Sequence, residues 1–208
     1  VDRGVIRPRS EPILPVGGLV ALFGTLAPGG AILKRSAADA RLFETEAAAV
    51  VFDSLEDLAA RVDDPDLPVT PESILVLKNA GPKGGPGMPE AGYLPIPQKL
   101  ARAGVKDMVR ISDARMSGTA FGTIVLHVTP EAAVGGPLAL VATGDRIRMS
   151  VRERKLDLLV GEAALARRRA AWVPAPAPER GYRKLYMDHV LQADAGCDFD
   201  FLRRLATR

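Results

Sequence analysis

The chain has 208 residues, of which 47% are hydrophobic, 25% are charged and 5% are aromatic. This length allows one substantial core or two small domains, and the composition is that of an ordinary globular protein. The formal net charge of +3 is too small to indicate a nucleic-acid-binding protein, and no stretch approaches the roughly 20 apolar residues of a membrane span.

The first part of the chain predicts short strands with two helices between them. The first sixteen residues contain three prolines and predict an extended linker. Compact apolar runs then predict buried strands, with a turn over residues 27–30. Ser54 is a cap-type residue before helical spacing, and Pro95 or Pro97 opens a second helix. In chain order we expect strands at 18–26, 31–34 and 46–52, a helix at 55–61, a strand at 74–78, a helix at 95–103, and strands at 107–111 and 123–128.

The later part predicts antiparallel strands and then helices. Residues 138–160 alternate between apolar and polar and are broken at residues 143–145 and 153–154, which predicts an antiparallel meander. An amphipathic helix is expected at 161–171 and, after a proline spacer, a helical tail at 182–193. The apolar side of this tail has no core of its own, so we expect it to pack against a domain outside this chain or against another subunit. The mixture predicts an α/β or α+β barrel-like domain over residues 17–172, with the spacer and a C-terminal arm over 173–208.

A loop rich in glycine and proline follows the predicted strand at 74–78. Residues 81–90 read GPKGGPGMPE, and four glycines with three prolines exclude regular structure. In α/β folds such a position, at the carboxyl end of a strand, is where ligands bind. Lys83 is not followed by Ser or Thr, so the loop is not a phosphate-binding loop. A tight structural turn and a ligand-binding loop closed by the carboxylate of Glu90 remain equal alternatives.

A second loop, at residues 112–122, reads SDARMSGTAFG and follows the predicted strand at 107–111. Ser117 and Thr119 place two hydroxyls beside Gly118. The run could cap a following helix, or it could display Ser117 at a strand-to-helix turn. The surrounding residues do not form a nucleophile elbow, and neither histidine has a fixed relation to Ser117, so a Ser-His-Asp hydrolase is poorly supported.

The two histidines favour packing roles. His127 lies in a predicted strand and is interpreted as a satisfied histidine of the sheet. His189 lies in the tail, where capping or packing is expected, although Asp188 and Asp194 nearby leave a site role open. The single cysteine, Cys197, excludes an internal disulfide and suits a reducing compartment. The sequence shows no clustered ligands of a zinc site.

These motifs resemble signature segments of the dihydroxy-acid/phosphogluconate dehydratase family. The resemblance is carried by residues 81–90, by 112–118, by HVTPEAA at 127–133 followed by GGP at 135–137, and by the hairpin at 144–160. It covers nearly the whole chain, and GGL at 17–19 through LAPGG at 26–30 resembles the start of that family's C-terminal domain. DARMSGT at 113–119, DHVLQAD at 188–194 and CDFDF at 197–201 are more similar to the sugar-acid (aldonate) branch, such as arabinonate and xylonate dehydratases, than to the branched-chain amino-acid branch.

The resemblance implies a swivelling β/β/α barrel-like domain with a mixed sheet and a C-terminal helical arm. It implies a cytoplasmic enzyme that assembles as a homo-oligomer, a dimer or a tetramer. In the family this domain closes over an N-terminal domain that supplies the iron–sulfur cysteines and most Mg²⁺ ligands. The chain starts at Val1 without an initiator Met, which reads as a cut inside a longer protein.

The resemblance also implies roles for individual residues. Glu90 is expected to be a Mg²⁺ ligand and Ser117 the general base, with Thr119 close by. Arg115, Gly118 and His189 are candidates for substrate binding, with a surface or loop-anchoring role of Arg115 as an equal alternative. A hydroxyl is a weak base near neutral pH, but a bound cation lowers the pKa of nearby hydroxyls, and a carboxylate is the hard oxygen ligand that Mg²⁺ takes. Cys197 matches no cluster ligand of the family.

The expected function is therefore that of the C-terminal portion of a hydro-lyase that dehydrates an aldonate to a 2-keto-3-deoxy acid. Alone, the chain is expected to fold and to be inactive. One alternative is a dihydroxy-acid dehydratase of branched-chain amino-acid synthesis. Another is a stand-alone swivelling domain that binds a partner or a small anion without catalysis. A nucleic-acid binder would require salt-sensitive affinity for DNA or RNA.

Overall fold

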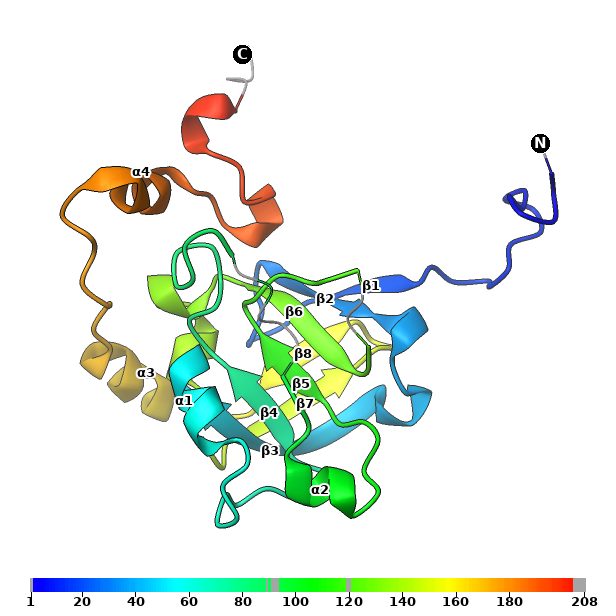
Figure 1. The fold of residues 1–208 in the computed structure, drawn as a ribbon, viewed down its shortest axis with the longest axis horizontal. Coiled ribbons are helices and arrows are strands. Elements are labelled where there is room, and N and C mark those ends of the chain that lie inside the picture. Colours follow the sequence, from blue (N-terminus) through cyan, green and yellow to red (C-terminus); the bar gives the residue numbers. More distant parts are fainter. Residues whose placement is uncertain (1, 89, 91–93, 119–120, 204–208) are drawn as a thin grey trace.

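The computed structural model describes residues 2–88, 90, 94–118 and 121–203, and its centre is a mixed sheet of eight strands (Figure 1). The strand order is β1-β2-β6-β5-β4-β3-β7-β8. Neighbours from β3 to β6 pair in parallel, and the other neighbours pair antiparallel. The strands are β1 (Leu19–Leu22), β2 (Gly30–Lys34), β3 (Glu44–Phe52), β4 (Ile74–Leu77), β5 (Arg110–Ser112), β6 (Ile124–Thr129), β7 (Arg146–Ser150) and β8 (Lys155–Leu158). The α-helices of the described residues are α1 (Leu55–Arg61), α2 (Gln98–Arg102), α3 (Glu162–Ala171) and α4 (Gly181–His189).

The two ends of the sheet meet, so that it nearly closes into a barrel. Phe23, directly after β1, forms an isolated bridge with Lys155 at the start of β8. Its amide donates to the carbonyl of Arg154 at 2.9 Å, and its own carbonyl accepts from the amide of Leu156 at 2.9 Å. Gly24 permits this approach, because a Cβ there would lie 2.2 Å from the carbonyl oxygen of Leu156. This contact pairs a part of the backbone that would otherwise be an exposed sheet edge.

Apolar side chains fill both faces of the central strands. Along β3, Ala49 and Val51 belong to one buried cluster, and Val50 and Phe52 belong to the other. Leu58 of α1 and Leu100 of α2 join the second cluster, so these two helices cover that face of the sheet. Burial on both faces explains why the sequence of β3 is a continuous apolar run rather than an alternating one.

The structure confirms the barrel-like α/β fold and the position of most elements, with α1 at the expected residues. The predicted meander at 138–160 is wrong in its first part. Pro137–Leu140 form a 3-10 helix whose Leu138 and Leu140 are buried, and only β7 and β8 form a hairpin. Alternating apolar residues in a short segment can therefore reflect burial at one end of a barrel as well as a strand.

Other predicted elements have different bounds: β1 and α2 are shorter than the expected 18–26 and 95–103. β5 is shorter and later than predicted, because the carboxylate of Asp107 accepts from the amide of Thr123 at 2.9 Å and pairs with Arg110 at 2.9 Å instead of entering the sheet. The predicted tail helix ends early, at His189, and a 3-10 helix follows at Ala193–Ala195.

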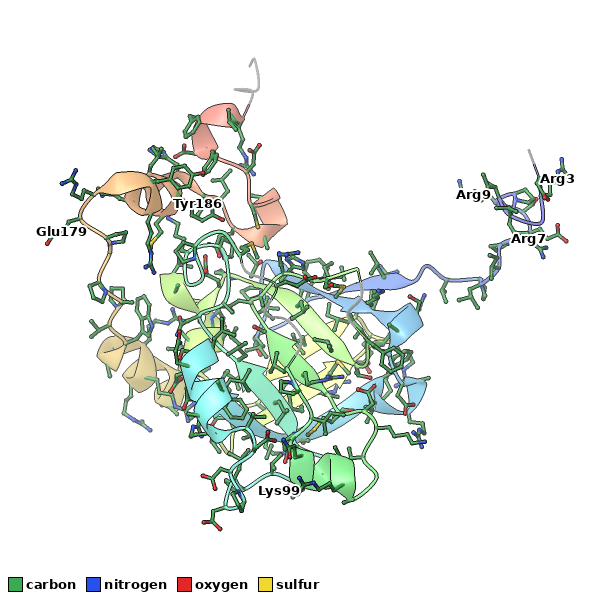
Figure 2. All side chains as sticks on the ribbon, viewed as in Figure 1. Arg3, Arg7, Arg9, Lys99, Glu179 and Tyr186 are labelled. Atoms are coloured by element: carbon green, nitrogen blue, oxygen red, sulfur yellow. The ribbon has the colours of Figure 1, made fainter. Side chains whose placement is uncertain are left out.

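The terminal segments lie outside the barrel. The N-terminal segment runs away from it, with Arg3, Arg7 and Arg9 far from the sheet (Figure 2). The chain after α3 passes along the barrel to α4, which lies beyond the loops at one end of the sheet (Figure 1). Within the described residues, no helix combines the length and apolarity needed to cross a membrane.

Candidate functional site

The two motif loops meet at one end of the barrel because the parallel strands β3 to β6 all end there. Asp113, the first residue after β5, joins them. Its carboxylate accepts from the amide of Ala80 after β4 and from the amide of Ala132 after β6, both at 2.9 Å. The side chain is almost fully buried, and this burial raises the pKa of Asp113 to about 6. One buried carboxyl group therefore holds three loops together.

The glycine-rich loop wraps around a second buried carboxylate, that of Glu131. This side chain is 1% exposed and accepts from the amides of Lys83 and Gly84, each at 2.9 Å. A Cβ at Gly81 would lie 2.7 Å from the same carboxylate, so glycine is needed there. The sequence left a structural turn and a ligand-binding loop as alternatives, and these contacts show that the loop has a structural role. Its ligand-binding role stays a prediction.

The C-terminal arm packs against this loop through the same carboxylate. The side-chain amide of Gln192 donates to Glu131 Oε1 at 2.5 Å, and its carbonyl accepts from the amide of Glu131 at 2.9 Å. The thiol of Cys197 lies 3.3 Å from the sulfur of Met88, and Val190 is buried. The tail was expected to pack against a domain outside this chain or against another subunit, and this part of it packs on its own domain instead.

Other apolar residues of the arm are not covered. Leu185, Phe201 and Leu202 are 48%, 60% and 61% exposed. The aromatic rings of the arm also contact one another: Tyr186 meets Phe199 edge-on at 5.6 Å, and Phe199 stacks on Phe201 at 5.4 Å. The expectation that the arm has no core of its own is therefore wrong in part, because these three rings pack together within the arm.

Ser117 is half-buried in the loop that joins β5 to β6. In the described part of this connection no helix follows it, so the helix-cap and strand-to-helix interpretations are wrong. The residues on either side are held: the amide of Met116 donates to His127 Nε2 at 2.9 Å, and Lys34 Nζ donates to the carbonyl of Gly118 at 2.6 Å. Thr119 lies outside the described residues. The expectation of a hydrogen-bonded histidine at 127 is confirmed.

Arg115 links the serine loop to the glycine-rich loop. Its Nε donates to the carbonyl of Met88 at 2.7 Å, and its Nη2 lies 3.9 Å from Glu90 Oε2. The two side chains are 42% and 50% exposed. The structure thus brings Glu90 and Arg115 together from separate loops, with Ser117 two residues further along one of them.

His189 lies apart from these contacts, at the end of α4. Its Nδ1 is 2.9 Å from Asp200 Oδ1, and its ring meets Phe201 edge-on at 5.2 Å. Both partners belong to the arm, which agrees with a packing role. Substrate binding by His189 stays a prediction.

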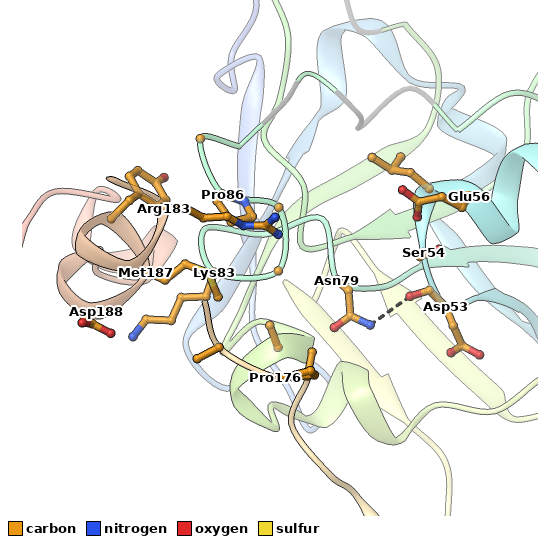
Figure 3. Close-up of a pocket in the computed structure, with 18 of the residues that line it drawn as sticks. Asp53, Ser54, Glu56, Asn79, Lys83, Pro86, Pro176, Arg183, Met187 and Asp188 are labelled. Carbon is orange, nitrogen blue, oxygen red and sulfur yellow. Dashed lines mark hydrogen bonds between the residues drawn. The ribbon is translucent and has the colours of Figure 1, made fainter. Parts of the chain in front are cut away.

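A groove of about 1160 Å³ separates α4 from the body of the barrel (Figure 3). Lys83, Arg183 and Asp188 line one side, and Asp53 and Asn79 line the other. The mixed charges give it no preference for cations or anions. Sequence reasoning did not identify this groove, because it exists only where the arm lies beside the loops.

The described residues do not form a complete metal centre. They contain no group of three or more His, Cys, Asp or Glu side chains that could hold a metal ion. Glu90 has the oxygen donors that Mg²⁺ prefers but offers a single carboxylate. Cys197, whose Sγ lies 3.3 Å from the sulfur of Met88, is the one cysteine of the sequence, and a cluster is held by several thiolates. An iron–sulfur cluster does not fit these residues, and Mg²⁺ would find one ligand.

Comparison with known proteins gives a family match over most of the chain. Residues 4–197 match the family model described as dihydroxy-acid/6-phosphogluconate dehydratase C-terminal. The chain is 51% identical to an L-arabonate dehydratase of Azospirillum brasilense and 52% identical to a 6-deoxy-6-sulfo-D-gluconate dehydratase of Pseudomonas putida, over 97% of its length in each case. It is 42% identical to a dihydroxy-acid dehydratase of Ignicoccus hospitalis over 94% of its length. It spans 36%, 36% and 35% of these relatives, about a third of each.

Proposed function

The chain belongs to the dihydroxy-acid/6-phosphogluconate dehydratase family, as its C-terminal domain, and we propose that it is part of a hydro-lyase that removes water from a sugar acid. Higher identity to the two sugar-acid dehydratases than to the dihydroxy-acid dehydratase supports an aldonate as substrate. The observation that carries the proposal is the meeting of the two motif loops, where Arg115 lies 3.9 Å from Glu90 and Ser117 follows on the same loop.

In the proposed reaction the aldonate loses the proton at C2 and the hydroxyl group at C3. The resulting enol tautomerises to a 2-keto-3-deoxy acid, so the overall change is the loss of one water molecule. Ser117 takes the C2 proton as general base. A cation close to this hydroxyl would favour its deprotonated form, and Lys34, bound to the carbonyl of Gly118, brings one to the same loop. In this proposal the exposed part of Arg115 binds the anionic substrate.

The cofactors of this reaction are also part of the proposal. Glu90 would supply one oxygen ligand to a Mg²⁺ ion, and a bound Mg²⁺ would supply positive charge that stabilises the enolate-like carboxylate. We infer that the remaining Mg²⁺ ligands and the cysteines of an iron–sulfur cluster lie in a part of the protein outside this chain, which spans about a third of its relatives. The isolated chain is then inactive, and the full-length enzyme is a cytoplasmic homo-oligomer.

The proposal is tested by turnover of the full-length enzyme on a panel of C5 and C6 aldonates and dihydroxyisovalerate. Wild type is compared with Ser117→Ala and with Ser10→Ala, a matched change in the exposed N-terminal segment. We expect one aldonate to be dehydrated, Ser117→Ala to lose several orders of magnitude in kcat, and Ser10→Ala to match wild type. Near-normal turnover by Ser117→Ala would show that the base lies elsewhere. Turnover of dihydroxyisovalerate alone would assign the chain to the other branch.

A further inference from the structure

His127 occupies an irregular position in the sheet, which turns its side chain toward the serine loop. The pairing of β2 with β6 shifts register between Gly30 and Ile32, opposite this part of β6, and His127 has a φ of +56°. Such bulges re-aim a side chain relative to its neighbours in a strand. The left-handed conformation is uncommon for a residue with a side chain, so the surrounding contacts hold His127 in it.

Both the backbone and the side chain of His127 bind the loop after β5. Its amide donates to the carbonyl of Ala114 at 3.0 Å, and its Nε2 accepts from the amide of Met116 at 2.9 Å. A backbone amide can only donate, so Nε2 must carry the lone pair and the ring proton must lie on Nδ1. The imidazole is therefore neutral in this arrangement. Burial and the positive charge of Arg115 both lower the pKa of His127, which agrees with this state near neutral pH.

We propose that His127 is a positioning residue that sets the place of Ser117 through its hydrogen bond to the adjacent amide of Met116. Nε2 is occupied by this bond, so His127 does not itself exchange protons with a substrate. Together with the bond from Lys34 to Gly118, it fixes the backbone on both sides of the serine. The inference rests on the proposed role of Ser117 as the base and adds the residue that holds this base in place.

The surroundings of His127 show what else can act on it. It lines a small hollow of about 270 Å³ with Phe23, Gly30 and, from the arm, Asp194. β1 and β2 contribute glycine and apolar side chains to this hollow. Among the described residues, Arg115 of the serine loop acts on His127 through its charge, and Asp194 of the arm lines the same hollow. Protonation of Nε2 removes the acceptor of the Met116 amide, so the loop is released as the pH falls through the pKa of His127.

The test compares full-length wild type with His127→Leu, which removes the acceptor, and His127→Gln, which keeps an acceptor oxygen but cannot titrate. We expect His127→Leu to lower kcat on the order of 10²-fold with KM little changed, as for a misplaced catalytic group. His127→Gln should recover most of this loss. Its kcat should also no longer fall at acidic pH to the extent that protonation of His127 causes in wild type. A purely structural residue would not change the pH profile.

Two further measurements separate this inference from the proposed function. In a Ser117→Ala background, His127→Leu should cause no additional loss, because groups that act as a unit are not additive. Nitrogen NMR of the 208-residue chain at neutral pH should show a protonated Nδ1 and an unprotonated Nε2. If Ser117→Ala is inactive but His127→Leu keeps wild-type kcat, or if Nε2 carries the proton, the inference is overturned while the proposed function stands. If Ser117→Ala is active, the proposed role of Ser117 fails first.

Discussion

Replacing Glu131 by glutamine tests whether one buried carboxylate holds the glycine-rich loop and the arm. Its oxygens accept from the amides of Lys83 and Gly84 and from the side-chain amide of Gln192, over separations of 48, 47 and 61 residues. The side chain is 1% exposed, so water cannot replace a lost partner without rearrangement. Glu131→Gln keeps the shape but replaces one acceptor oxygen by an NH₂ group that faces other donors.

The expected cost follows from this count of donors. A buried donor that loses its acceptor costs about 1–3 kcal/mol, and hydrogen bonds to a charged group are stronger than those to a neutral one. In Glu131→Gln, one donor faces the new NH₂ group and the other donors form weaker bonds to a neutral oxygen. Together these changes should lower the free energy of unfolding by about 3 kcal/mol. Gln192→Ala removes the arm's partner alone, and we expect a loss of about 1 kcal/mol.

Urea unfolding followed by circular dichroism measures these losses, and amide hydrogen exchange reports on Lys83 and Gly84 directly. In Glu131→Gln the protection of these two amides should fall. Glu72→Gln, the same change at an exposed glutamate, should stay within about 0.5 kcal/mol of wild type. If Glu131→Gln also stays within that range and both amides keep their protection, the carboxylate does not organise the loop and the reasoning is wrong.

Two further outcomes are expected of the same end of the barrel. The pKa of Asp113 is raised from 3.8 to about 6, so the folded state binds more protons between these pH values, and stability falls by about 3 kcal/mol as the pH rises through that window. Urea midpoints from pH 4 to pH 7 should show this difference between wild type and Asp113→Asn, and parallel curves would contradict it. Gly81→Ala places a Cβ 2.7 Å from a buried carboxylate and should cost about 1–3 kcal/mol, whereas a Cβ at Gly118 meets no atom of the described residues within 4 Å, so Gly118→Ala should melt close to wild type. Equal melting temperatures for the two alanine variants would refute the close contact.

The sequence alone determined the local elements and the two motif loops. The helix at Leu55–Arg61 follows from a cap, Ser54, and from apolar spacing, both of which lie within one short segment. The glycines and prolines of residues 81–90 exclude regular structure wherever the segment lies. The motif letters identify the family, because many residues match together.

Only the tertiary structure decided how these segments are joined. The bond between Met116 and His127 depends on a bulge that shifts β6 against β2, and no local pattern marks that shift. Glu131 reads as an ordinary charged residue in the sequence, yet it is buried by partners 47 to 61 residues away. Spacing and propensity report on neighbours along the chain, whereas a buried polar contact depends on which distant segments the closed sheet brings together. The backbone beside Ser117 is therefore held by contacts with distant residues, Lys34 and His127, which no local sequence pattern predicts.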